Sequence, residues 1–158
     1  MTTNTSLSFA DLGDTLTPTQ ASAWLGLLAT HHAIIRQLDA NLRASHHLGL
    51  STYEVLLRLA LAPTCRLRMS ELAANAPLTF SGISRMVDRL ERDGLVRREG
   101  SADDGRVACA TLTDHGLARL KAAHHTYLMG VRNLFLAHLS ELELETLGAC
   151  WARLGVCP

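Results

Sequence analysis

The stretch that decides the fold is MSELAANAPLTFSGISRMVDRLERDGLVRREGSADDGRVACATL, residues 69–112. Ser70 stands where it can cap a short helix over 71–76, because serine often accepts a hydrogen bond from the first turn. After a tight connection, Thr79 is placed to cap a second helix, which stops at Gly94. The pattern therefore predicts two consecutive short helices joined by a turn.

Two β-capable segments follow these helices, at residues 95–98 and 106–112. The second alternates small and β-branched residues, and a polar turn bearing Gly and Asp separates the two segments. A helix pair followed by a hairpin describes a winged helix-turn-helix, whose second helix can enter the DNA major groove. We therefore expect a mainly α (α+β) fold with such a lobe.

A helical wheel of residues 79–93 separates an apolar face from a polar one. The apolar face holds Ile83, Met86, Val87 and Leu90, and the polar face holds Ser81, Arg85, Asp88, Arg89 and Arg92. Arginine and serine donate hydrogen bonds to phosphates and base edges, and a helix start can hold a phosphate. A solvated face with an Asp88–Arg92 pair would give the same pattern.

The charge count does not distinguish a DNA-binding face from a solvated face. The chain carries 15 basic and 15 acidic residues, so its formal charge is zero, whereas nucleic-acid binders are usually basic. Residues 79–106 likewise hold six of each sign. All the basic residues except Lys121 are arginines, which make planar, bidentate contacts to phosphate and guanine.

The hairpin tip favours DNA binding. Asp104 lies two residues before Arg106 and can hold that side chain extended, which suits a narrow minor groove with negative potential. The alternative is a surface ion pair that contributes little.

Long apolar stripes flank the lobe. The first helix begins with a capping box at 17–20, ends at Gly49, and carries a stripe of Trp24, Leu28, His31, Ile35, Leu38 and Leu42. A second capping box at 51–54 starts a helix that stops before Pro63, and Thr113 and Ser140 cap the last two helices. The terminal stripes exceed what one small domain can cover, so we expect a two-fold homodimer. We divide the chain into a flexible arm (1–16), a dimerisation helix (17–49), the lobe (50–112) and C-terminal dimerisation helices (113–158).

The sequence resembles the MarR family of bacterial transcriptional regulators. The resemblance rests on the stretch SRMVDRLERDGLVRR followed by DDGR, with LGLSTYEVLLRLA upstream and ATLTDHG downstream. The likeness extends over about residues 18–155. The resemblance implies a dimer that binds a pseudo-palindromic double-stranded DNA operator, usually as a repressor. It also implies release by a small aromatic or phenolic acid bound between the dimer body and the lobe. The resemblance places the wing arginine at Arg106, held by Asp104.

These arguments select two sets of residues. The expected DNA-binding set is Thr79, Ser81, Ser84, Arg85, Arg89, Arg92, Arg97, Asp104 and Arg106. The candidate effector set, where the first, second and fifth helices would meet, is Trp24, His31, Tyr53, Arg58 and His124.

Other classes of function remain as alternatives or are excluded. Without a Ser-His-Asp order, P-loop, GxGxxG or HExxH motif, we expect no enzyme activity and no cofactor. Paired histidines and four cysteines leave open a metal- or redox-responsive regulator of the same fold, although no metal site is expected because carboxylates at ligand spacing are missing. The neutral charge leaves open a helical protein-interaction module. Residues 1–17 lack the pattern of a signal peptide and no apolar run could span a membrane, so we expect a cytoplasmic protein with free thiols.

Overall fold

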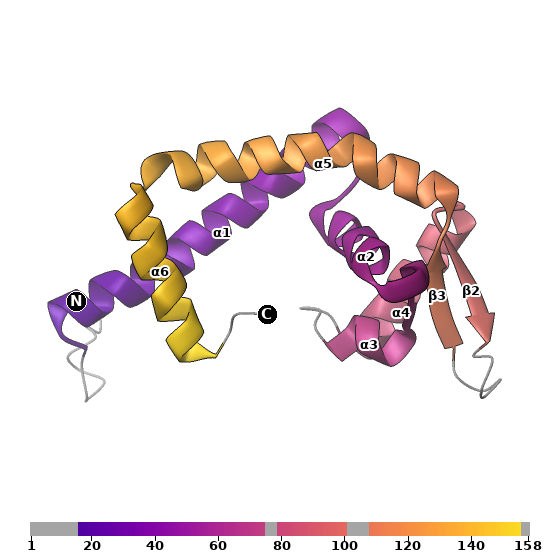
Figure 1. Ribbon diagram of the computed structural model, residues 1–158, viewed down its shortest axis with the longest axis horizontal. Helices are drawn as coiled ribbons and strands as arrows, with labels where there is room; N and C mark the ends of the chain where they lie inside the picture. The colour runs from indigo at the N-terminus through magenta and orange to yellow at the C-terminus, as the bar shows by residue number, and fades with distance from the viewer. Residues whose placement is uncertain (1–15, 75–78, 101–107, 156–158) are drawn as a thin grey trace, which may run out of the picture.

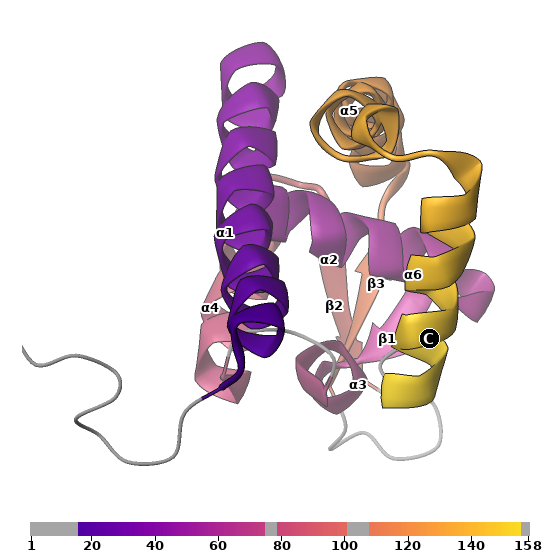
Figure 2. The ribbon, with the colours of Figure 1, turned by 90° about the vertical axis from the view of Figure 1, so that its left-hand side faces the viewer.

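The computed structural model describes residues 16–74, 79–100 and 108–155 and forms an arch (Figure 1). Helix α5 (Asp114–Leu134) forms the top of the arch, and the long helix α1 (Pro18–His46) rises obliquely from one side to pack against it. At one end, α6 (Glu141–Leu154) follows the short turn η3 (Leu136–His138) and comes down beside α1. Figure 2, turned by 90°, shows α1 and α6 on either side of α5.

The other end of the arch is a compact lobe. Its helical elements are α2 (Leu50–Leu61), the turn η2 (Pro63–Cys65), α3 (Met69–Ala74) and α4 (Phe80–Arg92). Its strands are β1 (Arg66–Arg68), β2 (Val96–Gly100) and β3 (Ala108–Leu112), antiparallel in the order β1-β3-β2. The predicted hairpin is confirmed as β2 and β3, with Val96 opposite Leu112. Strand β1 was not predicted.

Local capping signals correctly predicted where four of the helices begin. Thr17 and Ser140 form the predicted capping boxes, and Thr79 and Thr113 accept from the backbone N–H groups of Gly82 and Gly116 at 3.2 and 3.0 Å. Because these bonds join residues three apart, the sequence alone reveals them.

Three predicted boundaries are wrong. Helix α1 ends at His46, before Gly49, and Gly49 instead precedes α2 as its N-cap. Ser51 is therefore inside α2 and caps nothing, while the N–H of Leu50 donates to Asp39 of α1 at 2.8 Å. Ser70 lies inside α3, where Glu71 accepts from the N–H of Arg68 at 2.7 Å.

The hydrophobic core lies in the lobe and under α5. The apolar face of α4 predicted from the wheel is buried in the core, as expected, where α4 packs mainly against α3 and β2. In contrast, only Leu38 and Leu42 of α1 are buried, and no residue of α6 is buried against the described part of the chain. The core therefore supports the lobe and leaves much of the apolar surface of the terminal helices uncovered. None of the described helices combines the length and apolarity that a bilayer crossing requires.

Candidate nucleic-acid interface

The outer face of α4 displays arginine. Ser81, Arg85, Arg89 and Arg92 are exposed, opposite the buried apolar face. The Nε groups of Arg85 and Arg92 donate to the carbonyl oxygens of Ser81 and Asp88, one turn earlier, each at 3.3 Å. Their side chains therefore fold back along the helix.

The acidic residues of α4 are bound within the lobe. Arg98 of β2 pairs with the Asp88 carboxylate at 2.7 Å, and it also donates to the carbonyl and hydroxyl oxygens of Ser84 at 3.0 and 3.1 Å. Glu91 accepts from the backbone N–H of Arg98 at 2.9 Å. The helical wheel allowed an ion pair between Asp88 and Arg92. In the structure, Asp88 pairs with Arg98 of β2 instead. These bonds attach the hairpin to α4.

A second network ties the hairpin together around Glu99. Its carboxylate accepts from Arg97 at 2.6 Å and from the hydroxyl of Thr111 at 3.1 Å, and it lies 4.0 Å from Arg66. The Arg97 guanidinium holds the pKa of Glu99 below its usual value, with help from Thr111. The three strands therefore share the half-buried carboxylate of Glu99 as a common partner.

These pairings show how the charges near α4 are distributed. Two of the acidic side chains near α4 are neutralised by Arg97 and Arg98 or by Arg66. Within the described residues, Arg85, Arg89 and Arg92 form no ion pair. The outer face of α4 is therefore positively charged although the chain is neutral overall.

The structure separates the predicted DNA-binding residues into groups. Thr79 caps α4 and lies 3.1 Å from the Ser81 hydroxyl, so both hydroxyls stand at the exposed helix start. Ser84 and Arg97 are engaged by Arg98 and Glu99, which gives them a bracing role inside the lobe. Asp104 and Arg106 lie outside the described residues.

Comparison with known proteins identifies the chain. Residues 46–107 match the sequence profile of the MarR family. The structure is similar to AbsC, a MarR family transcriptional regulator from Streptomyces coelicolor, with 30% identity and a TM-score of 0.84 over 90% of this chain and 95% of that one. The chain belongs to the MarR family of transcriptional regulators.

Two further relatives agree with this assignment. Sco3205, a MarR family regulator from Streptomyces coelicolor solved in complex with DNA, is 31% identical with a TM-score of 0.83, over 90% of this chain and 89% of that one. The HTH-type transcriptional repressor YetL from Bacillus subtilis is 29% identical over 72% of this chain and 70% of its own length. The relatives of this MarR-family chain are transcriptional regulators and not enzymes.

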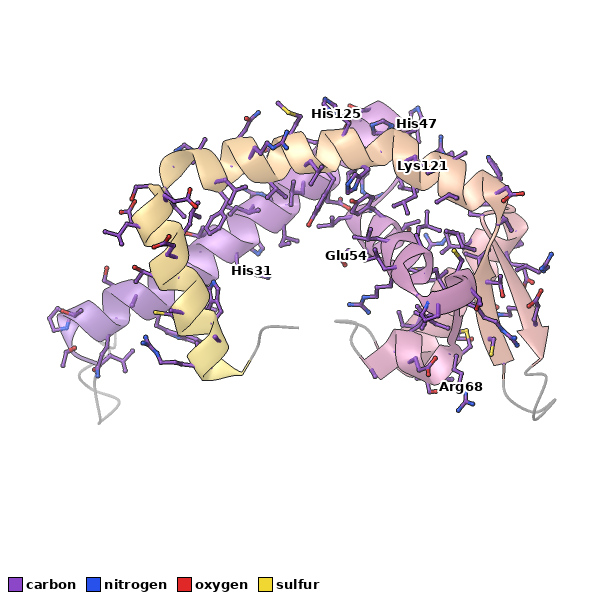
Figure 3. All side chains as sticks on the ribbon, viewed as in Figure 1. His31, His47, Glu54, Arg68, Lys121 and His125 are labelled. Atoms are coloured by element: carbon purple, nitrogen blue, oxygen red, sulfur yellow. The ribbon has the colours of Figure 1, made fainter. Side chains whose placement is uncertain are left out.

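The candidate effector residues of this MarR-family chain lie in three places. Tyr53 is fully buried, shares a 2.7 Å hydrogen bond with Nδ1 of His124, and stacks on Tyr127 with ring centroids 4.6 Å apart. Trp24 and His31 line a different hollow between α1 and α6, and Figure 3 labels His31 under the arch. Arg58 donates to the carbonyl of Leu72 in α3 at 3.3 Å. The structure therefore divides the set into Tyr53 with His124, Trp24 with His31, and Arg58 at a third place.

Sequence reasoning missed Arg98 and Arg66. Both were counted as basic residues, but each braces the lobe through bonds to other elements, Arg98 to α4 and Arg66 to the carbonyl of Gly100 at 2.8 Å. No local spacing signals such a contact. Among the described residues of this MarR-family chain, no His, Cys, Asp and Glu cluster could hold a metal, and Cys65, Cys109 and Cys150 are free thiols.

We expect high pH to destabilise the fold through Tyr53. Burial raises the pKa of Tyr53 to about 12, with a smaller contribution from Tyr127. Because the folded-state pKa lies above that of the unfolded chain, this stability is complete below pH ~10 and is lost as pH rises to ~12. The loss should be ~2 kcal/mol in the free energy of unfolding, measured by urea denaturation at several pH values. Tyr53→Phe should remove most of this dependence of the unfolding free energy on pH. A variant with the pH dependence of wild type would contradict the assignment of the effect to Tyr53.

Proposed function

We propose that this chain binds a pseudo-palindromic DNA operator as a homodimer, with α4 in the major groove and the wing in the minor groove. The observation that carries this proposal is the outer face of α4, where Arg85, Arg89 and Arg92 have no ion-pair partner among the described residues. Guanidinium groups on the exposed face of a helix fit the phosphates and base edges of a groove. The protein acts in the cytoplasm, most simply as a repressor that blocks transcription.

The homodimer follows from the uncovered terminal helices. Trp24, Leu25 and Leu28 of α1 are 52%, 53% and 47% exposed, and α6 exposes Leu142 and Leu154. A largely apolar hollow of about 710 Å³ between α1 and α6 is lined by further apolar residues, including Leu27, Phe135 and Trp151. Monomers rarely expose so continuous an apolar surface. We infer that residues 17–49, which include α1, and the C-terminal helices within residues 113–158 form the dimer body. Residues 50–112 then form the lobe that contacts DNA.

The wing contributes through Arg106, which lies outside the described residues. Arg98 joins strand β2 of the wing to α4 through Asp88 and Ser84, so the described base of the wing is attached to the recognition helix. We expect Arg106→Ala to raise the operator Kd by ~10-fold and to lower the slope of log Kd against log salt by about two units, one for each subunit of the dimer. A gel shift or anisotropy titration at several salt concentrations measures both, and an unchanged Kd and slope would remove the wing from the interface.

A small aromatic or phenolic acid is the proposed effector, and Tyr53 and His124 are the residues most suited to it. They join α2 to α5, that is, the lobe to a helix that we assign to the dimer body. A ligand that favours one spacing of the two α4 helices shifts their fit to major grooves ~34 Å apart. Titration of phenolic acids into an operator complex tests this proposal. Release of DNA supports it, and failure of every compound contradicts it.

The DNA-binding proposal is tested by recovering bound fragments from sheared genomic DNA. We expect the full-length protein to enrich fragments with a repeated half-site separated by one helical turn. If no fragment is enriched and no gel shift occurs at low salt, the lobe is instead a module for binding protein.

A further inference from the structure

A polar hollow of about 380 Å³ lies where the body of the arch meets the lobe. It is bounded by the end of α1, the first turn of α2, the last turn of α4 and the start of α5. Its charged and titratable lining is Arg43, His47, Arg89, Asp93, His115 and Arg119. Three guanidinium groups and one carboxylate therefore line the hollow, and a second carboxylate, Asp39, is paired with Arg43.

Two of the three guanidinium groups are held in place. Arg119 donates to the carbonyl oxygen of His46 at 2.7 Å. Arg43 pairs with Asp39 at 2.6 Å and lies so close to Gly49 that a Cβ there would approach its Nη2 atom to 2.8 Å. A side chain that is already ordered loses less conformational entropy when it binds a ligand. The hollow is thus lined by positioned cationic groups.

The backbone around the hollow adds to this character. Gly49 and Thr52 in the lining belong to the start of α2, whose N-cap supplies no side-chain hydrogen bond. The N-terminus of a helix carries a partial positive charge, and here the Leu50 N–H donates to Asp39. His47 has a left-handed φ of 52° at the C-cap of α1, where glycine is the usual residue. The chain thus places an imidazole in the lining at a position that ordinarily favours a residue without a side chain.

We propose that this hollow binds the dianionic phosphoryl group of a small molecule, either inorganic phosphate or a phosphomonoester. Guanidinium forks match the geometry of phosphate oxygens, and several of them around one site favour a tetrahedral dianion over a single carboxylate. The lining has no Phe, Tyr or Trp, so it offers no surface on which a phenyl ring could stack. The site therefore differs in place and in chemistry from the proposed effector site at Tyr53 and His124.

Bound phosphate also links the hollow to DNA, and this step depends on the proposed function. Arg89 lines the hollow and stands on the exposed face of α4. An anion that draws Arg89 into the hollow removes one cation from the DNA-facing surface. Because coupling between two binding sites is reciprocal, phosphate weakens DNA binding and DNA weakens phosphate binding by the same factor.

The first test uses the full-length protein without DNA. Inorganic phosphate and glycerol phosphate are titrated separately at constant ionic strength, adjusted with sodium chloride, with Tm and titration calorimetry as readouts. We expect saturable binding, and a rise in Tm of about 3–5 °C at a tenfold excess over Kd. Saturation by both compounds assigns the site to phosphoryl groups in general, and a tighter glycerol phosphate Kd assigns it to phosphomonoesters.

Variants locate the site. Arg119→Gln should weaken phosphate binding at least 10-fold, but it also removes a bond to His46 and could lower stability. His47→Gly supplies the second variant, because glycine suits a φ of 52° and preserves the fold while removing the imidazole. Lys121→Gln is the matched control, since Lys121 is exposed on α5 and absent from the lining (Figure 3). It should leave phosphate binding unchanged.

The outcomes against the proposal are distinct from failure of DNA binding. A Tm that follows ionic strength alone, or equal phosphate binding by Arg119→Gln, His47→Gly and wild type, would overturn it. If phosphate has no effect but Arg119→Gln weakens binding to a non-specific duplex, the hollow contacts the DNA backbone and the small-molecule proposal is wrong. With DNA binding established, phosphate should raise the operator Kd several-fold in wild type and less in His47→Gly.

Discussion

Leu27→Glu should convert the protein from a dimer into a monomer and abolish measurable operator binding. Leu27 lies on α1, is 40% exposed, and lines the largely apolar hollow that we assign to the partner subunit. In a two-fold dimer the substitution would bury two carboxylates without partners, which costs several kcal/mol for each ion. We expect the dimer Kd to rise by at least ~1,000-fold, since each 1.4 kcal/mol corresponds to a factor of ten.

Sedimentation velocity over a range of protein concentrations measures this shift. Leu61→Glu is the matched control, because Leu61 is an exposed leucine (76%) at the end of α2, in the lobe. It should remain a dimer. If the Leu27→Glu protein sediments as a dimer, the dimer interface lies elsewhere. The apolar hollow between α1 and α6 is then not covered by the partner subunit.

Gly116→Ala should cause the largest loss of stability among single methyl additions at the described glycines. A Cβ at this position would lie 2.1 Å from the carbonyl oxygen of Leu95 and 2.8 Å from a methyl of Leu112. The nearest obstacle is backbone, so α5 must shift away from the start of the wing. We expect the free energy of unfolding to fall by ~3 kcal/mol, against a gain of ~1 kcal/mol in helix propensity.

Urea denaturation measures the effect. Gly148→Ala in α6 is the control, since no atom lies within 4 Å of the added Cβ. That change should leave stability equal or slightly higher. Equal stability of wild type and Gly116→Ala would mean that α5 and the wing are not packed as described.

Features that depend on neighbouring residues were predictable from the sequence. The caps at Thr17, Thr79, Thr113 and Ser140 use bonds over three residues, and the apolar face of α4 follows from helix geometry alone. Strand β1 could not be predicted in the same way. Its three residues become a strand only because β3, more than 40 positions later, pairs with them.

The candidate site shows the same division. The wheel placed Arg85, Arg89 and Arg92 on the outer face of α4, as the structure does. The wheel could not show that Asp88 forms an ion pair with Arg98, because Arg98 lies on strand β2 and not on the same helix. The effector set was assembled where the first, second and fifth helices were expected to meet, and an apolar stripe does not identify the helix that packs against each of its residues. His31 and His124 consequently lie at different sites, beside Trp24 and Tyr53 respectively.

The central claim is that the arginine face of α4 holds DNA. Its most direct test is the salt dependence of Kd for a recovered genomic fragment, compared between wild type and the double variant Arg85→Ala/Arg92→Ala. We predict a Kd raised by ~100-fold and a salt slope lowered by about four units, two for each subunit, with the dimer intact and Lys121→Gln unchanged. A double variant with the Kd and salt slope of wild type would contradict it.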